Sequence, residues 1–124
     1  MAVTWTTSIE SVDWDELSEL YRIAPLGTKS GDWLRTAYSN SMFKWLAYDD
    51  GKIVAAGRAV ADGVDCSYLC DIVVHPAYQG AGLGRELIQR LIGASKGHRK
   101  IILYAVPGRE PFYEKFGFRR MKTA

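Results

Sequence analysis

The stretch from Asp71 to Arg85, DIVVHPAYQGAGLGR, decides the fold. An apolar run ends at Pro76, and glycines follow at positions 80, 82 and 84. Apolar residues then recur at positions 87, 88, 91 and 92, which is the spacing of one face of an α-helix. The stretch therefore predicts a strand, a glycine-rich turn and an amphipathic helix that begins near Gly82.

The glycine-rich turn predicts a binding site for a phosphate group. Glycines let the backbone approach a ligand closely, and the first N–H groups of a helix have no partner within it. The positive end of the helix dipole favours an anion at the same place. A Walker loop is excluded because no lysine follows Gly84, and a dinucleotide fingerprint needs a third glycine where Arg85 or Leu87 stands. An ordinary strand-to-helix turn is the alternative.

Two blocks of sequence together resemble the GNAT superfamily of N-acetyltransferases. The pattern Gln79-x-x-Gly82-x-Gly84 after Val74-His75-Pro76 resembles motif A, whose loop holds the pyrophosphate of coenzyme A. The block PFYEKFGF at 111–118 resembles the short helix after the fifth strand of that family, whose tyrosine faces the thioester sulfur. The blocks stand in the family order, and the resemblance covers about 44–118.

The resemblance implies an α/β (α+β) GNAT fold in a single domain over residues 1–124. We expect a mixed, mostly antiparallel sheet of about six strands, splayed between the fourth and fifth, with four helices around it. The chain ends six residues after Phe118, where the family usually continues into another strand. We therefore expect a shortened C-terminus whose last strand is absent, very short or supplied by a partner.

The hydrophobic pattern predicts the individual elements in the same order. Alternation and turn residues predict strands, and the wider spacing predicts helices. Strands are expected at 3–9, 43–48, 53–61, 67–74 and 100–106, and helices at 14–24, about 33–38, from 82 onward and around 112–113.

Composition excludes several classes of protein. Sixteen basic and fourteen acidic residues give a net charge of +2, which is too small to indicate a nucleic-acid-binding surface. No apolar run approaches the ~18 residues of a membrane span, and the N-terminus resembles no secretory leader. Cys66 and Cys70 would lie ~13 Å apart on one strand, too far for a disulfide. We expect a cytoplasmic protein without a metal, because a zinc site from these cysteines with His75 and His98 matches no ligand template.

The resemblance also implies which residues hold acetyl-CoA. The backbone of Ile72, Val73 and Val74 is expected to pair with the pantetheine, while their side chains pack in the core. The pyrophosphate cradle is expected at Gln79, Gly80, Ala81, Gly82, Leu83, Gly84 and Arg85. For the Arg85 side chain, a solvated place on the helix surface is the alternative.

Tyr113 and Asp71 are the candidate catalytic residues. Tyr113 is expected to protonate the departing thiolate, although its free pKa of ~10 exceeds the ~8.5 of a thiol, so only its position makes it useful. Core packing is the alternative. Asp71 interrupts an apolar strand at the point where that strand should open onto the acceptor. Its carboxylate is expected to act as a base or as an anchor for the amine. A carboxylate bonded to the backbone at a bulge is the alternative.

Other side chains have weaker assignments. Arg58 and Asp62 share a strand face, either as an ion pair at the acceptor rim or as plain surface charges. Trp33, Tyr38 and Trp45 either wall an acceptor pocket or belong to the core. The basic residues Lys44, Lys96, Arg99 and Lys100 are read as surface charges, with contact to the cofactor's 3′-phosphate as the alternative.

The sequence thus predicts an enzyme that transfers an acetyl group from acetyl-CoA to a primary amine by direct attack in a ternary complex. The segment 57–63 and the strand ending at Val74 resemble small-amine, arylalkylamine-type GNAT proteins, which favours a small-molecule acceptor. A homodimer is expected, without nucleic acid or membrane partners. A non-catalytic coenzyme A-binding regulatory module and a protein N-acetyltransferase are the alternatives.

Overall fold

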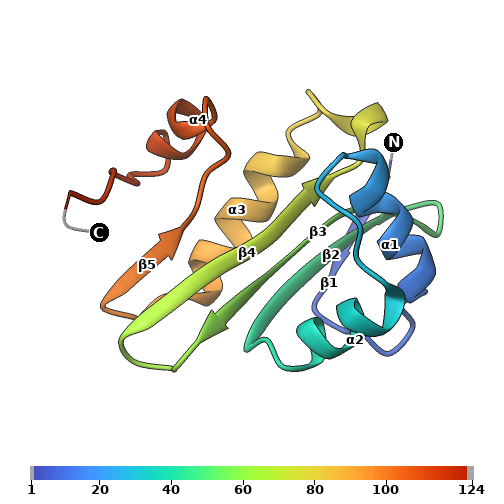
Figure 1. Cartoon of the computed structure of the whole chain (residues 1–124), viewed down its shortest axis with the longest axis horizontal. Helices are drawn as coiled ribbons and strands as arrows, with labels where there is room; N and C mark the ends of the chain where they lie inside the picture. Colours follow the sequence, from blue (N-terminus) through green and yellow to red (C-terminus); the bar gives the residue numbers. More distant parts are fainter. Residues whose placement is uncertain (1, 123–124) are drawn as a thin grey trace.

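A single sheet with helices on both faces forms the molecule in the computed structural model, which describes residues 2–122 (Figure 1). The strands lie in chain order across the sheet: β1 (Val3–Thr6), β2 (Phe43–Asp49), β3 (Lys52–Ala61), β4 (Cys66–Val74) and β5 (Lys100–Leu103). Strands β1 to β4 are antiparallel neighbours, and β5 runs parallel to β4. The helices are α1 (Trp14–Ile23), α2 (Gly31–Ser39), α3 (Leu83–Ala94) and α4 (Glu110–Glu114), with a short 3-10 turn η1 (Pro76–Tyr78).

The α/β class and the splayed sheet are confirmed, but the strand count is lower than expected. Five strands, not six, lie within residues 2–122. Residues 119–122 form no strand, and residues 123 and 124 lie outside the described part of the chain. Strand β5 also ends earlier than predicted. Its apolar run continues to Val106, but pairing with β4 stops at Leu103. The chain then turns at Pro107 and Gly108, where the Arg109 N–H donates to the Val106 carbonyl at 2.9 Å.

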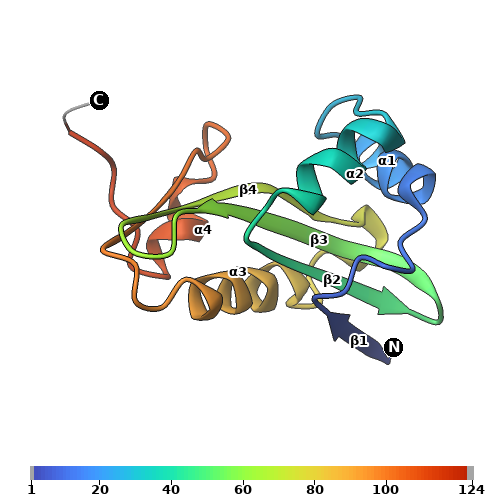
Figure 2. The same ribbon diagram turned by 90° about the horizontal axis from the view of Figure 1, so that it is seen from below.

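Each face of the sheet carries its own core. Helices α1 and α2 cover one face, and α3 lies on the other (Figure 2). On the first face Leu17, Tyr21 and Tyr38 pack against buried strand residues such as Val73. On the second face Leu87 and Leu91 of α3 pack against residues that include Ala55 and Leu69.

A β-bulge in β4 bends the strand at Asp71. Ala56 pairs with Val73 and Arg58 pairs with Cys70, so Gly57 alone faces two residues, Asp71 and Ile72. Asp71 has a φ of 53°, in the left-handed region that few residues other than glycine adopt. Gly57 fits this site because an added Cβ would lie 3.1 Å from a Leu91 methyl.

The bend separates β4 from β5. Their parallel pairing runs from Cys66 with Lys100 to Leu69 with Leu103 and then stops. Within the described residues, the rest of β4 up to Val74 therefore has no β5 partner on that side. This is the splay that the sequence predicts between the fourth and fifth strands, and it leaves an open strand edge inside the molecule.

Candidate active site

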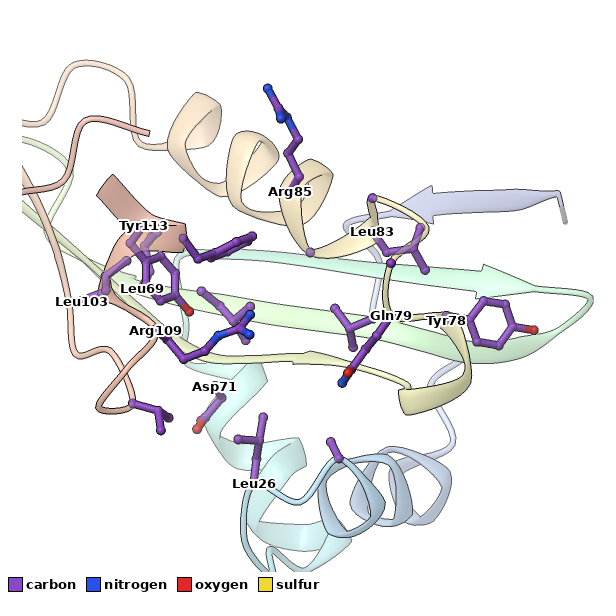
Figure 3. A pocket seen from close by; sticks show the side chains of 18 of the residues that line it. Leu26, Leu69, Asp71, Tyr78, Gln79, Leu83, Arg85, Leu103, Arg109 and Tyr113 are labelled. Carbon is purple, nitrogen blue, oxygen red and sulfur yellow. The ribbon is translucent and has the colours of Figure 1, made fainter. Parts of the chain in front are cut away.

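A pocket of about 800 Å³ opens at the splay (Figure 3). The start of α3 and the glycine turn form one wall, the free edge of β4 forms the floor, and the segment from β5 to α4 forms the other wall. Ten of the twelve predicted site residues line it; Val73 and Ala81 do not. Segments far apart in the sequence thus meet at one place.

The glycine turn presents an open helix N-terminus to the pocket. Gly80 and Gly82 have φ values of 88° and 84°, which residues with a side chain rarely adopt. Gly82 directly precedes Leu83, and a glycine has no side chain with which to cap the helix. The first N–H groups of α3 therefore point outward without an intrahelical partner. Such a turn suits an anionic group, as the sequence predicts.

The free edge of β4 contributes backbone and apolar side chains. Ile72 and Val74 line the pocket and pack with the α3 layer. Val73, between them, is 1% exposed and packs with the α1 and α2 layer on the other face. Core packing is thus observed for Val73, and any contact that it makes in the pocket must come from its main chain.

Tyr113 enters the pocket from α4, where aromatic rings hold it. Its ring lies 5.1 Å from that of Phe112 and 6.3 Å from that of Phe118, both nearly edge-on. Burial raises the pKa of the Tyr113 phenol, and the charge of Arg109 partly opposes that rise. The phenol is therefore protonated at neutral pH, which is the state that a proton donor needs.

Asp71 lines the pocket, as do Leu26 of the α1–α2 loop and Arg109 (Figure 3). Its carboxylate accepts a hydrogen bond of 2.9 Å from Nε of Arg58 and forms an ion pair of the same length with Nη2. Its backbone carbonyl accepts a hydrogen bond from the Tyr21 hydroxyl. Both its main chain and its side chain are thus fixed by other elements.

An ion pair between Arg58 and Asp62 is not what the structure shows. The Asp62 carboxylate instead accepts the N–H groups of Val64, Asp65 and Cys66 at 2.7–3.2 Å and closes the β3–β4 turn. These bonds stabilise its charged form and lower the pKa of Asp62 to about 2. Arg58 pairs with Asp71 instead, because the bulge brings Asp71 beside Arg58.

The predicted aromatic wall is divided between different layers. Tyr38 of α2 is buried in the core between the helices α1 and α2 and the sheet, and Trp33 is exposed on α2. Trp45 packs with the α3 layer, where the Arg90 guanidinium lies 4.6 Å from its ring. The structure therefore does not bring the three rings together.

The pocket lining does not include the remaining predicted basic residues or the two thiols, which are Lys44, Lys96, Arg99, Lys100, Cys66 and Cys70. Arg99 and Lys100 pair with Asp65, and the Lys44 ammonium donates to the Ser41 carbonyl. Arg85 is among the residues that line the pocket, but its exposed side chain points away from the other labelled side chains (Figure 3). Cys66 and Cys70 are unpaired, and residues 2–122 contain no cluster of three or more His, Cys, Asp and Glu side chains suited to a metal.

Sequence reasoning missed several residues of the pocket. Arg109 and Phe112 precede the predicted Tyr113 by four residues and one, and this proximity is the only signal for them in the sequence. Tyr104 and Val106 are exposed residues that follow β5, whereas apolar alternation placed them inside a strand. Leu26 lies in the α1–α2 loop and reaches the pocket only through folding, so nothing in the sequence marked it.

Solved structures share this architecture. A probable acetyltransferase of unknown function from methicillin-resistant Staphylococcus aureus superposes with a TM-score of 0.89 at 23% identity, covering 98% of this chain and 93% of that one. A Trypanosoma brucei acetyltransferase gives a TM-score of 0.81 at 28% identity and covers 99% and 96%. The fold is that of the GNAT acetyltransferases.

The sequence places the chain in the same family. Residues 7–118 match the Acetyltransferase (GNAT) family, and the chain belongs to this family of acyltransferases, which use acetyl-CoA. Serotonin N-acetyltransferase 2, chloroplastic, of Oryza sativa subsp. japonica is 35% identical over 117 residues, which are 90% of this chain and 58% of that protein. Glucosamine 6-phosphate N-acetyltransferase of Trypanosoma brucei brucei is 47% identical over 70 residues, 55% of this chain and 44% of that protein. The chain thus spans about half the length of these curated relatives.

No helix in the described part of the chain is both long enough and apolar enough to cross a membrane.

Proposed function

We propose that the protein transfers the acetyl group of acetyl-CoA to the primary amine of a small molecule, in a complex that holds both substrates. One observation carries this proposal. A single pocket joins an uncapped helix N-terminus, a free strand edge, a protonated tyrosine and a carboxylate. These four features match the four demands of acetyl transfer: anchoring the cofactor, aligning the thioester, protonating the thiolate and holding the amine.

The wall and floor of the pocket suit acetyl-CoA. The pyrophosphate would accept hydrogen bonds from N–H groups of the turn 79–85. The turn has space for it, because an added Cβ at Gly80 or Gly82 would meet no heavy atom of the described residues within 4 Å. The pantetheine would lie along β4 at 72–74 like an additional strand, using backbone groups that β5 leaves free. A main-chain N–H at this edge would polarise the thioester carbonyl.

The chemistry needs two proton movements. The neutral amine nitrogen attacks the thioester carbon, the carbon–sulfur bond breaks, and the nitrogen loses a proton to water or a carboxylate. The thiolate takes a proton from Tyr113, which regains one from solvent. Because the Tyr113 pKa is above that of a thiol, this transfer is uphill and depends on the fixed position of the ring in its aromatic cluster.

The acceptor end of the pocket favours an amine with an apolar body. Asp71 supplies a negative charge, and the exposed apolar residues Leu26, Tyr104 and Val106 line the same pocket. The rice relative is named for serotonin and the trypanosome relative for glucosamine 6-phosphate, both small amines. Serotonin fits this apolar lining better than glucosamine 6-phosphate does. The phosphate of glucosamine 6-phosphate would need a cation in the pocket, and Arg109 would have to supply it.

An acceptor panel tests the proposal. Purified protein is given acetyl-CoA with serotonin, 2-phenylethylamine, glucosamine 6-phosphate or a lysine peptide, and free thiol is followed over time. We expect release with arylalkylamines above the rate without acceptor. Release only with the peptide would support a protein N-acetyltransferase, and acetyl-CoA binding without release for any acceptor would support a non-catalytic module.

A cytoplasmic location is part of the proposal, supported by composition and by two unpaired cysteines. The rice relative is named as chloroplastic, so fractionation of the source cells is the deciding measurement. Recovery of the protein with an organelle would refute the assignment.

A further inference from the structure

We propose that Arg58 is a positioning residue, which holds Asp71 as a fixed anchor for the amino group of the acceptor; this inference rests on the proposed function. Arg58 lies on β3, and its side chain is only 13% exposed. An arginine so covered needs partners for its donors. Its contacts show which residue it serves.

The guanidinium of Arg58 is held by three separate elements. Nε and Nη2 both approach Oδ2 of Asp71 on β4 at 2.9 Å. Nη1 donates to the hydroxyl of buried Ser41, after α2, at 3.2 Å, and that hydroxyl donates to the Ala37 carbonyl at 2.7 Å. The ring of Trp33 on α2 lies 5.9 Å from the guanidinium carbon. These contacts leave the guanidinium little freedom to turn.

Arg58 acts on the pocket through Asp71. Asp71 lines the pocket, whereas Arg58 is not among the residues that line it. Both contacts from Arg58 go to Oδ2, so Oδ1 is the oxygen left to meet a ligand. A direct role for Arg58 in binding an acidic acceptor would need it at the pocket surface, and the structure places it behind the carboxylate.

The main chain of Asp71 is held as firmly as its side chain. Its positive φ of 53° is unfavourable for a residue with a Cβ. The Tyr21 hydroxyl donates to the Asp71 carbonyl, and the Tyr38 hydroxyl lies 2.7 Å from that of Tyr21. Since Tyr21 uses its proton on Asp71, Tyr38 is the donor in the tyrosine pair. Two buried tyrosines and one arginine thus stabilise an otherwise unfavourable conformation.

This arrangement favours orientation over proton removal at Asp71. With its charge matched by Arg58, the carboxylate offers Oδ1 as a hydrogen-bond acceptor in a fixed direction. The amine nitrogen is then held toward the thioester, and its proton passes to solvent at the mouth of the pocket. The assignment distinguishes the two roles, base and anchor, that the sequence leaves open for Asp71.

A double-mutant cycle tests the inference with Arg58→Met, Asp71→Asn and the double variant. Asparagine keeps the shape of aspartate and tolerates a positive φ. Arg58→Met is expected to lower kcat/KM for the amine by roughly tenfold, with the KM for acetyl-CoA unchanged. In the Asp71→Asn background the same substitution should cause no further loss, because its effect passes through the carboxylate. Arg58→Lys, which keeps the charge but not the paired donors, should recover only part of the activity.

Two controls separate positioning from general stability. Arg99→Met removes an arginine from an ion pair with Asp65 outside the pocket, and it should leave kcat/KM unchanged. Thermal unfolding of every variant reports folding independently of turnover. Losses in kcat/KM that simply add for Arg58→Met and Asp71→Asn would overturn the inference, as would wild-type kinetics in Arg58→Met.

A binding measurement distinguishes failure of the inference from failure of the proposed function. The same variants, saturated with coenzyme A, are titrated calorimetrically with 2-phenylethylamine, so that no turnover is needed. If the wild-type protein releases thiol only at the background rate with every acceptor, the proposed function is refuted. A non-additive loss of amine affinity in Arg58→Met and Asp71→Asn would still support the role of Asp71 as an anchor. If the wild-type protein does not bind the amine, or if Arg58→Met binds it equally well, the inference about the anchor is refuted.

Discussion

At the scale of single residues, Tyr113 combines a buried phenol with a position beside the free edge of β4. Tyr113→Phe removes one hydroxyl and keeps the ring contacts with Phe112 and Phe118. The fold should survive, while the chemical step should slow by up to ~100-fold if the phenol is the general acid. Single-turnover kinetics of thiol release measure that step. A rate equal to wild type would return Tyr113 to a purely structural role.

The buried tyrosines make the folded protein less stable at alkaline pH. Burial raises the pKa values of Tyr21 and Tyr38 well above the usual ~10, so both stay protonated in the folded protein. Above about pH 10 the unfolded chain loses phenolic protons that the folded chain retains, and the free energy of unfolding falls as the pH rises. This contribution is fully present below that pH. Tyr38→Phe should cost about 1 kcal/mol at neutral pH and make the alkaline decline shallower. Urea unfolding at about pH 8 and pH 11 measures both effects, and equal slopes in the two proteins would contradict them.

At the scale of elements, helix α3 offers a matched pair of glycines, one near each end. Gly84 lines the pocket, and an added Cβ there would lie 3.6 Å from Val74 and 3.7 Å from Phe112. Gly93, near the other end of the same helix, is exposed, and an added Cβ would meet none of the described residues within 4 Å. Neither glycine has a positive φ, so valine at either position has a similar backbone cost.

Gly84→Val should therefore weaken acetyl-CoA binding, whereas Gly93→Val should not. Filling a close-fitting site with extra methyl groups costs about 1–3 kcal/mol, roughly tenfold or more in Kd. Calorimetric titration of both variants with acetyl-CoA measures this difference. Equal affinities in two folded variants would place the cofactor elsewhere.

Most elements could be predicted because their signals are local. Hydrophobic spacing located α1, α3 and the β2–β3 hairpin to within a few residues. Helix α2 begins earlier than predicted, at Gly31, because the Ser30 side chain accepts the N–H of Trp33 and caps it. Strand β5 was predicted too long because apolar residues after Leu103 line a pocket instead of a sheet.

The candidate site could be predicted only where one segment supplies several residues. The glycine turn and the block around Tyr113 carry their own patterns, and ten of the twelve predicted residues line the pocket. The contact between Arg58 and Asp71 depends on strand register and on the bulge opposite Gly57, which no local pattern encodes. Alternation along one strand places Arg58 and Asp62 on the same face, as an ion pair or as surface charges, and it gives no signal for the partner on the next strand.

At the scale of the whole molecule, β5 is an edge strand. It pairs with β4 alone among the described residues, and a second pocket of about 400 Å³ lies between it and residues 118–121. Free edges favour pairing with another chain, and identical chains most often close as two-fold dimers. We predict a homodimer with β5 at or near its interface. Light scattering at micromolar concentration should give twice the 13.9 kDa of one chain. A single species of 13.9 kDa would contradict the prediction.

The reaction proposed for this pocket moves an acetyl group from sulfur to nitrogen. It is tested most directly by measuring free coenzyme A and N-acetylated amine together, by mass spectrometry, in one reaction with acetyl-CoA and an arylalkylamine. Equal amounts of the two products are expected throughout the time course, and both should be lost in Asp71→Asn. Free coenzyme A without acetylated amine, or neither product despite bound acetyl-CoA, would contradict it.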